Sequence, residues 1–440
     1  ALLAALSLAA EAGRPRAAAG PVAGACLGAG LSAAFLLPFL EYLPRSAAWA
    51  GEDRHLAPLS LGGLVRFIVP RAEGSHPIEG AAYLSLAVLP LAALGLLAGR
   101  RERRTLALAL AAALLLLAAY DGPLSRLLVE ETPVRWSRTL LLLPIPAALL
   151  AARGLDELRS RARRPALAAR LAFGIAAGCG AELLSAAAGV HALTAPSARR
   201  LETPLLARIA SDRGVFRVLP LHTWLPANSA TSLGLDDLRG YDALAVRAFR
   251  AERRKVGRFH GVPTHTDVVA PWDLAPGGRE LDAWNVKYLL LHPQFAFSAP
   301  TLNEKLGLDL VEIGSSPEGK LLENRRVMPR ARVEGDGRGG GTARILEATS
   351  TRWLFDVAAP GGGTLVVANA GYPGWEARVD GKRIRVGGGE GRRQEIAVPA
   401  GRSRVELAYR PLSFRAGLLV SCVSFAVAAA LLARRPRQRR

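Results

Sequence analysis

The sequence predicts a polytopic α-helical membrane protein with an extracytoplasmic domain, built from an α/β unit and an antiparallel β-sandwich. Half of the 440 residues are hydrophobic and the mean hydropathy is +0.19, which is high for a soluble protein. Several apolar runs approach the roughly 20 residues that cross a bilayer. Short strand patterns with glycine-rich turns fill the chain after residue 327, and these are typical of antiparallel β-structure.

The helical part is predicted from apolar runs at 1–10, 17–40, 81–98, 105–120, 139–152, 167–193 and 416–433. They predict a transmembrane domain over 1–193 with about six spans, the first of them truncated, and a final span with a basic cytoplasmic tail over 413–440. The run 139–152 is short and contains Pro144 and Pro146. It is therefore open to two interpretations, a kinked span or a core helix of a soluble domain.

The net charge of +20 is concentrated in alternate loops. Arginine is abundant after the first, third, fifth and last apolar runs, at 14–16, 100–104, 153–165 and 434–440. This alternation is the positive-inside pattern, and it predicts that the segment 194–413 lies outside a bacterial inner membrane. Because topology accounts for the charge, the sequence argues against a nucleic-acid partner.

The segment 194–326 is predicted as an extracytoplasmic α/β unit. Buried strands are expected at Val215–Leu221 and Val286–His292, and Asp236–Arg258 is expected to be mostly helical. The basic residues of 247–258 would form a solvated face or a site for an anionic polymer. No glycine-rich phosphate loop follows either strand, so no nucleotide or other cofactor is evident.

The segment 327–412 is predicted as a β-sandwich. Strands at Trp375–Val379 and Arg383–Val386 flank Asp380-Gly381, and this dipeptide favours the positive φ angles of a tight hairpin turn. The sandwich would then lead directly into the last span.

Several stretches resemble one known family. "YPGWEARVDGK" (372–382), "VPAG" (398–401) and "ELAYRPLSFRAGLLVS" (406–421) resemble the C-terminal end of bacterial YfhO-like membrane proteins. "RWSRTLLLLPIPAALLAARGLDEL" (135–158), "LPANSATSLGLDDLRGYDAL" (225–244) and "NVKYLL" (285–290) also match that family. The resemblance covers nearly the whole chain.

The YfhO-like family is similar to GT-C glycosyltransferases. The resemblance implies transfer of a sugar from a polyprenyl-phosphate carrier to a cell-envelope polymer acceptor outside the membrane. It also implies catalytic carboxylates in the first outward loop, which we expect upstream of residue 1. On this interpretation the chain is the C-terminal part of an enzyme and transfers no sugar alone. The alternative is a non-enzymatic membrane protein whose outer domain binds glycan or organises envelope assembly.

Candidate site residues follow from this chemistry. Arginine suits a lipid phosphate because its planar guanidinium group can donate two parallel hydrogen bonds, and carboxylates, imidazoles and aromatic rings suit a sugar. The alternatives are solvated interfacial charges and aromatic residues that anchor a turn. The candidates for the lipid phosphate are Arg135, Arg138, Arg71 and Arg54. The candidates for the sugar are Glu52, Asp53, His55, His76, Glu79, Tyr372 and Trp375.

Two other classes of function have weaker support. His222, His260, His265 and His292 lack the spacing of a zinc site, so no metal is expected. A transporter needs paired ionisable residues within its spans, and Glu182 is the only mid-span candidate.

Overall fold

The computed structural model describes most of the chain. The chain divides into two compact units. Unit 1 comprises 1–30 and 54–195, and unit 2 comprises 31–53 and 196–440. The described residues are 16–50, 59–68, 83–131, 136–188, 203–222, 224–225, 228–240, 242, 244–262, 266–295, 297–335 and 340–433.

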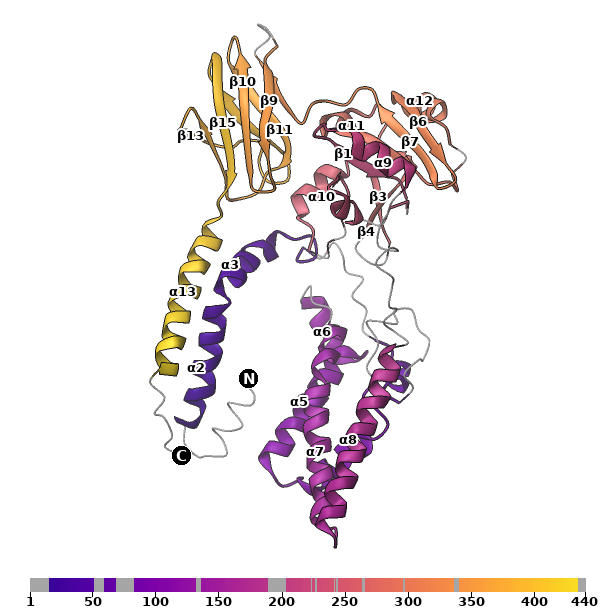
Figure 1. Ribbon diagram of the computed structural model, residues 1–440, viewed down its shortest axis with the longest axis vertical. Helices are drawn as coiled ribbons and strands as arrows, with labels where there is room; N and C mark the ends of the chain where they lie inside the picture. The colour runs from indigo at the N-terminus through magenta and orange to yellow at the C-terminus, as the bar shows by residue number, and fades with distance from the viewer. Residues whose placement is uncertain are drawn as a thin grey trace. The chain divides into compact units, whose positions relative to one another are not determined.

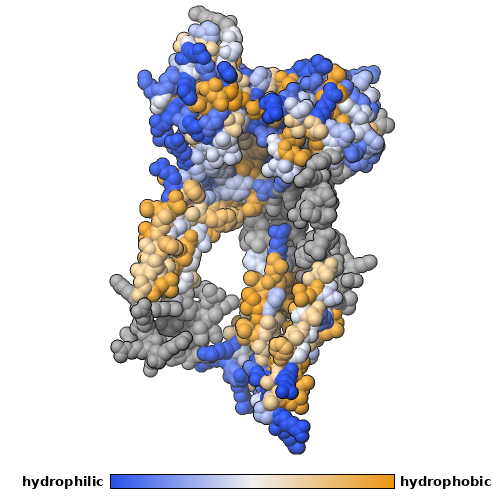
Figure 2. Space-filling view, viewed as in Figure 1, coloured by the Kyte–Doolittle hydropathy of each residue, from blue (hydrophilic) through white to orange (hydrophobic). Residues whose placement is uncertain are grey.

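Unit 1 is helical (Figure 1). Most of its helices lie in the predicted apolar runs with differences in length, whereas η2 and α6 lie in none of them, and the run 1–10 is outside the described residues. The helices are α2 (Arg16–Leu31), η2 (Leu61–Phe67), α4 (Val88–Ala98), α5 (Arg103–Ala119), α6 (Pro123–Glu131), η3 (Trp136–Leu142), α7 (Pro144–Ser160) and α8 (Pro165–Ala188). Figure 2 shows that their surface is largely apolar.

Among the described residues, three helices are long and apolar enough to cross a membrane: Trp136–Ser160, Pro165–Ala188 and Leu412–Ala433. The helices Val22–Leu31 and Ala33–Arg45 are long and apolar enough to cross a membrane only if the two together form one bent span. The run 81–98 gives α4 alone, a helix of 11 residues, which is shorter than a bilayer requires. Pro144 begins α7 and Pro146 lies in its first turn, where proline costs no helical hydrogen bond.

In unit 1, α4 packs closely against α7. Gly95 of α4 and Gly154 of α7 are both buried at this contact. A β-carbon on Gly95 would lie 1.9 Å from the carbonyl oxygen of Leu150. The absence of side chains therefore allows the two backbones to approach each other closely.

The first part of unit 2 is an α/β unit around a five-stranded sheet of order β2-β1-β5-β7-β6. β1 is parallel to β2 and β5, and β7 is antiparallel to β5 and β6. The strands are β1 (Arg217–Pro220), β2 (Asp236–Asp237), β5 (Val286–Leu291), β6 (Leu310–Ser316) and β7 (Gly319–Asn324). The helices are η5 (Ser229–Leu233), α9 (Pro204–Ser211), α10 (Arg247–Arg253), α11 (Arg279–Ala283) and α12 (Ala299–Leu306).

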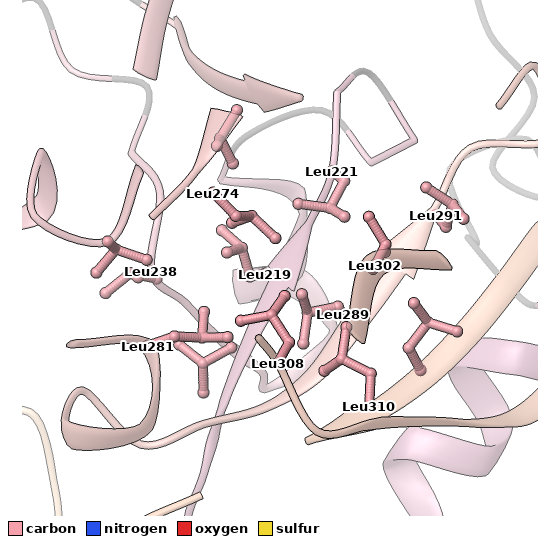
Figure 3. Packing of buried hydrophobic residues seen from close by; sticks show 14 of the residues in the cluster. Leu219, Leu221, Leu238, Leu274, Leu281, Leu289, Leu291, Leu302, Leu308 and Leu310 are labelled. Atoms are coloured by element: carbon pink, nitrogen blue, oxygen red, sulfur yellow. The ribbon is translucent and has the colours of Figure 1, made fainter. Parts of the chain in front are cut away.

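The strands at 215–221 and 286–292 were predicted as buried, and this prediction is confirmed by β1 and β5. All four residues of β1 are buried, as expected for a strand covered on both faces. Figure 3 shows the leucine-rich core beside this sheet, where Leu219 and Leu289 meet Leu302 of α12.

The prediction that Asp236–Arg258 is mostly helical is wrong. The helix α10 covers 247–253 only, and the chain enters β3 (Gly257–Val262), which forms a hairpin with β4 (Thr266–Leu274). The basic face is also not simply solvated, because Arg253 is 3% exposed. Its guanidinium group lies over the rings of Phe249 and Phe259, which compensates for part of the lost hydration.

The second part of unit 2 is a pair of antiparallel sheets with strand orders β13-β12-β15-β10-β9 and β14-β11-β8. Buried residues of both sheets, among them Phe355, Leu365 and Leu407, share one core. The strands are β8 (Ala331–Glu334), β9 (Thr342–Ala348), β10 (Arg352–Ala359), β11 (Gly363–Ala370), β12 (Trp375–Val379), β13 (Lys382–Ile384), β14 (Arg393–Val398) and β15 (Gly401–Tyr409).

The hairpin at Asp380-Gly381 is confirmed. β12 and β13 are antiparallel, with Val379 opposite Lys382. The φ angles of Asp380 and Gly381 are 48° and 81°, both in the left-handed region that this turn requires.

Two helices complete unit 2: α3 (Ala33–Tyr42), followed by η1 (Leu43–Arg45), and α13 (Leu412–Ala433), which follows β15 after two residues. α3 packs against α13 (Figure 1). Gly417 of α13 lies against the backbone of Ala33, and the Ser421 hydroxyl accepts a hydrogen bond of 3.0 Å from the Ala34 N–H. That bond satisfies a backbone donor at the start of α3, which has no partner within its own helix. α3 therefore packs with α13 near the end of the chain, although its residues fall within the predicted domain 1–193.

Candidate functional site

The candidate site is a cavity of about 600 Å³ in unit 2, between the α/β unit and the β-sandwich. This volume lies within the range of pockets that hold small molecules, and pockets favour domain interfaces. Its lining comes from the α9–β1 connection, the η5–β2 segment, the β9–β10 loop and the ends of β11 and β12. The lining residues are Ala210, Asp212, Gly214, Val215, Phe216, Leu233, Gly234, Leu235, Asp236, Arg330, Ala348, Thr349, Ser350, Trp353, Asn369, Ala370 and Trp375.

Arg330 is the central polar residue of this cavity. Its Nε donates a hydrogen bond of 3.0 Å to the side-chain oxygen of Asn369, and its Nη2 donates one of 2.9 Å to Asp236. The guanidinium carbon lies 5.5 Å from the centroid of the Trp353 ring. Burial lowers the pKa of Arg330, and the carboxylate of Asp236 opposes this shift. The group stays charged because the ordinary pKa of arginine is far above neutrality.

Hydrogen bonds across the α/β–sandwich junction hold the cavity walls in place. Arg217 of β1 donates to the carbonyl oxygens of Trp284 and Ala368, at 2.8 and 2.6 Å. Arg393 of β14 forms a second link, an ion pair of 2.6 Å with Glu280 of α11. Burial, followed by the neighbouring charge of Arg330, lowers the pKa of Arg217. The two parts of unit 2 are thus joined by charge-assisted bonds, which are stronger than neutral ones.

Asp212 supplies a second carboxylate at the cavity. It accepts hydrogen bonds from the Lys287 ammonium group, from the Tyr288 hydroxyl at 2.8 Å and from the Gly214 N–H at 2.8 Å. Burial acts to raise the pKa of Asp212, but the bonds from Lys287, Gly214 and Tyr288 outweigh it and hold this pKa below its ordinary value. Asp212 is therefore ionised and held in one position at neutral pH.

The lining combines aromatic rings with groups that form directional hydrogen bonds. Trp375 and Trp353 contribute aromatic rings, the latter beneath the Arg330 guanidinium, and Asp236, Arg330 and Asn369 contribute donors and acceptors in a fixed arrangement. Such a surface suits a ligand with an apolar face and several hydroxyl groups.

The two predicted aromatic candidates lie in different surroundings. Trp375 lines the cavity and packs against Tyr409. Tyr372 instead belongs to a cluster at the end of α3, where its ring lies 6.0 Å from that of Tyr42 and 5.9 Å from the guanidinium of Arg45. Burial raises the pKa of Tyr372 to about 12. Its position favours the interpretation that it anchors a turn.

Most other predicted site residues lie outside the described residues. Arg138 is described, and it is exposed on η3, at the start of the candidate span Trp136–Ser160. The predicted residues outside the described ranges are Arg54, Arg71, Arg135, Glu52, Asp53, His55, His76 and Glu79.

Glu182 of α8, the mid-span acid, is held by a short segment that precedes α4. The hydroxyls of Tyr83 and Ser85 both donate to its carboxylate, and the Leu86 N–H lies 3.4 Å from it. Ser85 is fully buried and has a φ of 78°, a conformation that costs a non-glycine residue free energy. This acid is therefore an acceptor in a local hydrogen-bond cluster.

The histidine candidates are only partly described. The rings of His222 and His292 lie 6.3 Å apart, and Phe295 packs against both. In the described part of the chain, no group of three or more His, Cys, Asp or Glu side chains could hold a metal ion. His265 lies outside the described residues, as does the side chain of His260.

Sequence reasoning missed Arg330, Asp236, Asn369 and Trp353. One signal was available, because the predicted boundary near residue 327 places Arg330 at the junction between the predicted α/β unit and the predicted sandwich. Comparisons with known protein families, curated proteins and solved structures found no match to this chain.

Proposed function

We propose that this chain is part of a membrane protein that handles cell-envelope glycan, and that the cavity around Arg330 binds the saccharide. One observation carries the proposal: a buried guanidinium group, held by Asp236 and Asn369 and lying over the ring of Trp353, lines a cavity of about 600 Å³ that is also lined by Trp375. The aromatic rings suit the apolar faces of sugar rings. The fixed polar groups suit the sugar hydroxyls, which both donate and accept hydrogen bonds.

The membrane setting of this proposal rests on the three apolar helices that could cross a bilayer. α13 follows the last strand of the sandwich after two residues, so a span at α13 would hold the cavity close to a membrane surface. We place that surface on the outer side of a bacterial cell membrane, as the arginine distribution predicts.

The test is saccharide binding by the full chain in detergent. Chitotriose, cellotriose and maltotriose are the probes, and isothermal titration calorimetry measures the dissociation constants. Ser350 lines the cavity on the exposed β9–β10 loop, so Ser350→Trp fills the cavity without disturbing a core. Ser315, exposed on β6 away from the cavity, gives the matched control Ser315→Trp.

We expect at least one trisaccharide to bind the parent chain and the Ser315→Trp variant, and to bind the Ser350→Trp variant at least about tenfold more weakly. Equal binding by the two variants would place the saccharide elsewhere. Absence of binding by all three probes would contradict the proposal.

A second function, sugar transfer from a polyprenyl-phosphate donor to a cell-envelope polymer, has one favourable observation. Arg138 is exposed at the start of a candidate span, two residues after Trp136, and tryptophan favours the membrane interface. A guanidinium at that depth suits a lipid phosphate. In the complete protein, Arg135→Ala or Arg138→Ala should slow transfer at subsaturating donor, and parental rates in both variants would contradict the phosphate role.

A further inference from the structure

A second cavity, of about 380 Å³, lies in unit 1 between α7 and α8. It surrounds the turn 161–164, which joins two candidate membrane spans, Trp136–Ser160 and Pro165–Ala188. Because a turn of four residues cannot cross a bilayer, both spans must end at the same membrane surface. The end of the cavity nearest the turn therefore lies at the depth of the lipid headgroups.

The polar end of this cavity is basic. Arg159, Arg163 and Arg164 line it, and the described lining residues include no Asp or Glu. Arg159 also lies 3.5 Å from Asp156, but both side chains are at least half exposed, at 50% and 70%, so that pair compensates little of the charge. The cavity thus presents a concentration of positive charge where phosphate groups of lipids are found.

The rest of the lining is apolar. Leu155 and Leu158 contribute from α7, and Leu167, Leu171 and Ile175 contribute from α8. The α8 residues recur every four positions and therefore share one face of the helix. They extend the apolar surface by roughly 12 Å along the axis. Leu167 and Leu171 are 50% and 60% exposed.

We propose that this groove binds one anionic glycerophospholipid, with its phosphate on the arginines of the turn and an acyl chain along the leucines of α8. A free phosphate ion would use the arginines but leave the apolar groove empty. A zwitterionic lipid would bring its own cation towards three guanidinium groups. The combination of charge and apolar length therefore favours a lipid with a net negative headgroup.

The experiment measures lipid binding to the purified full chain by native mass spectrometry in detergent. Dioleoyl phosphatidylglycerol is the probe, and dioleoyl phosphatidylcholine is its zwitterionic counterpart, which has no net charge. We expect one phosphatidylglycerol to bind more tightly than any phosphatidylcholine. In the double variant Arg163→Ala/Arg164→Ala its affinity should fall about tenfold or more, because each basic residue near a membrane surface contributes appreciably to the attraction.

The control is the double variant Arg100→Ala/Arg101→Ala. It removes the same charge from another exposed basic loop of unit 1, which does not line this cavity. It should bind phosphatidylglycerol as the parent does. Leu171→Trp, which fills the groove and keeps every arginine, should also weaken binding.

Five outcomes would overturn the proposal. Four of them are equal losses in the two double variants, equal binding of the two phospholipids, displacement by inorganic phosphate, and a preference for undecaprenyl phosphate. The fifth is binding of phosphatidylglycerol by Leu171→Trp as tightly as by the parent, because an acyl chain in the groove would then be contradicted.

Discussion

Gly95 and Gly154 face each other across α4 and α7 so closely that neither position has room for a side chain. A β-carbon on Gly154 would lie 2.0 Å from the carbonyl oxygen of Leu91, and one on Gly95 would lie 1.9 Å from that of Leu150. Both distances are far below van der Waals contact, and both obstacles are backbone. Small residues at such crossings allow helices in membranes to pack by close contact of their backbones.

Gly154→Ala should therefore separate α4 from α7 and destabilise unit 1. We expect a loss of about 1–3 kcal/mol, the usual cost of inserting a methyl group where the surroundings cannot yield. Thermal unfolding of the full chain in detergent measures it. The matched control is Gly174→Ala in α8, where a β-carbon meets nothing within 4 Å. That change should be neutral or stabilising, because alanine favours helix more than glycine.

Gly381→Val should destabilise the β-sandwich through the backbone alone. Gly381 has a φ of 81°, and a β-carbon there would meet nothing within 4 Å. Steric clash with neighbouring atoms is thus absent, and the cost is that of forcing a β-branched residue to positive φ, about 1 kcal/mol or more. Gly381→Asn is the control, because asparagine tolerates this conformation. Equal melting temperatures for the two variants would argue against the turn as the cause.

Asp212→Asn should destabilise the α/β unit by about 1 kcal/mol at neutral pH, because it removes the ion pair with Lys287. The pKa of Asp212 is lowered in the folded state. Its contribution to stability is therefore complete above the unfolded-state pKa of about 4 and is lost as the pH falls through the folded-state value. The difference in unfolding free energy between parent and variant should shrink as the pH falls below 4. A difference that is independent of pH would show that the carboxylate charge is not the cause.

Glu182→Leu should destabilise unit 1 more than Glu182→Gln. Leucine leaves the hydroxyls of Tyr83 and Ser85 without their acceptor, whereas glutamine keeps one oxygen that can accept. A buried donor without a partner costs about 1–3 kcal/mol, and Ser85 is fully buried. Unfolding of the two variants in detergent gives the comparison, and equal stability would contradict the role of the acceptor.

Local patterns predicted much of the architecture. Apolar runs predicted α5, α8 and α13, and the alternation around Asp380-Gly381 predicted its hairpin, because these elements are determined by residues close in sequence. The segment Asp236–Arg258 was predicted wrongly because strand pairing overrides its helical pattern at both ends: Asp236 and Asp237 pair with β1, and Gly257 pairs with β4.

The candidate site could not be predicted in this way. Arg330 meets Asp236 and Asn369, which are 94 and 39 residues away, so no short motif contains the site. Its members come together only when the α/β unit packs against the sandwich. Trp375 was identified because it lies in an aromatic-rich turn, whereas Trp353 lies in an ordinary strand pattern.

The orientation of the chain in the membrane can be tested by labelling single cysteines. The arginine-rich loops and the β-sandwich should lie on opposite sides of the membrane, because lysine and arginine near spans are retained in the cytoplasm. Lys382, exposed in the β12–β13 hairpin, and Arg101, exposed between α4 and α5, are suitable positions for single cysteines. The native cysteines at 26, 179 and 422 are first replaced by serine or alanine. In intact cells a membrane-impermeant maleimide should label the Lys382→Cys variant and not the Arg101→Cys variant, and permeabilised cells should show labelling of both. Labelling of Arg101→Cys alone in intact cells would show the opposite orientation, with the cavity around Arg330 in the cytoplasm.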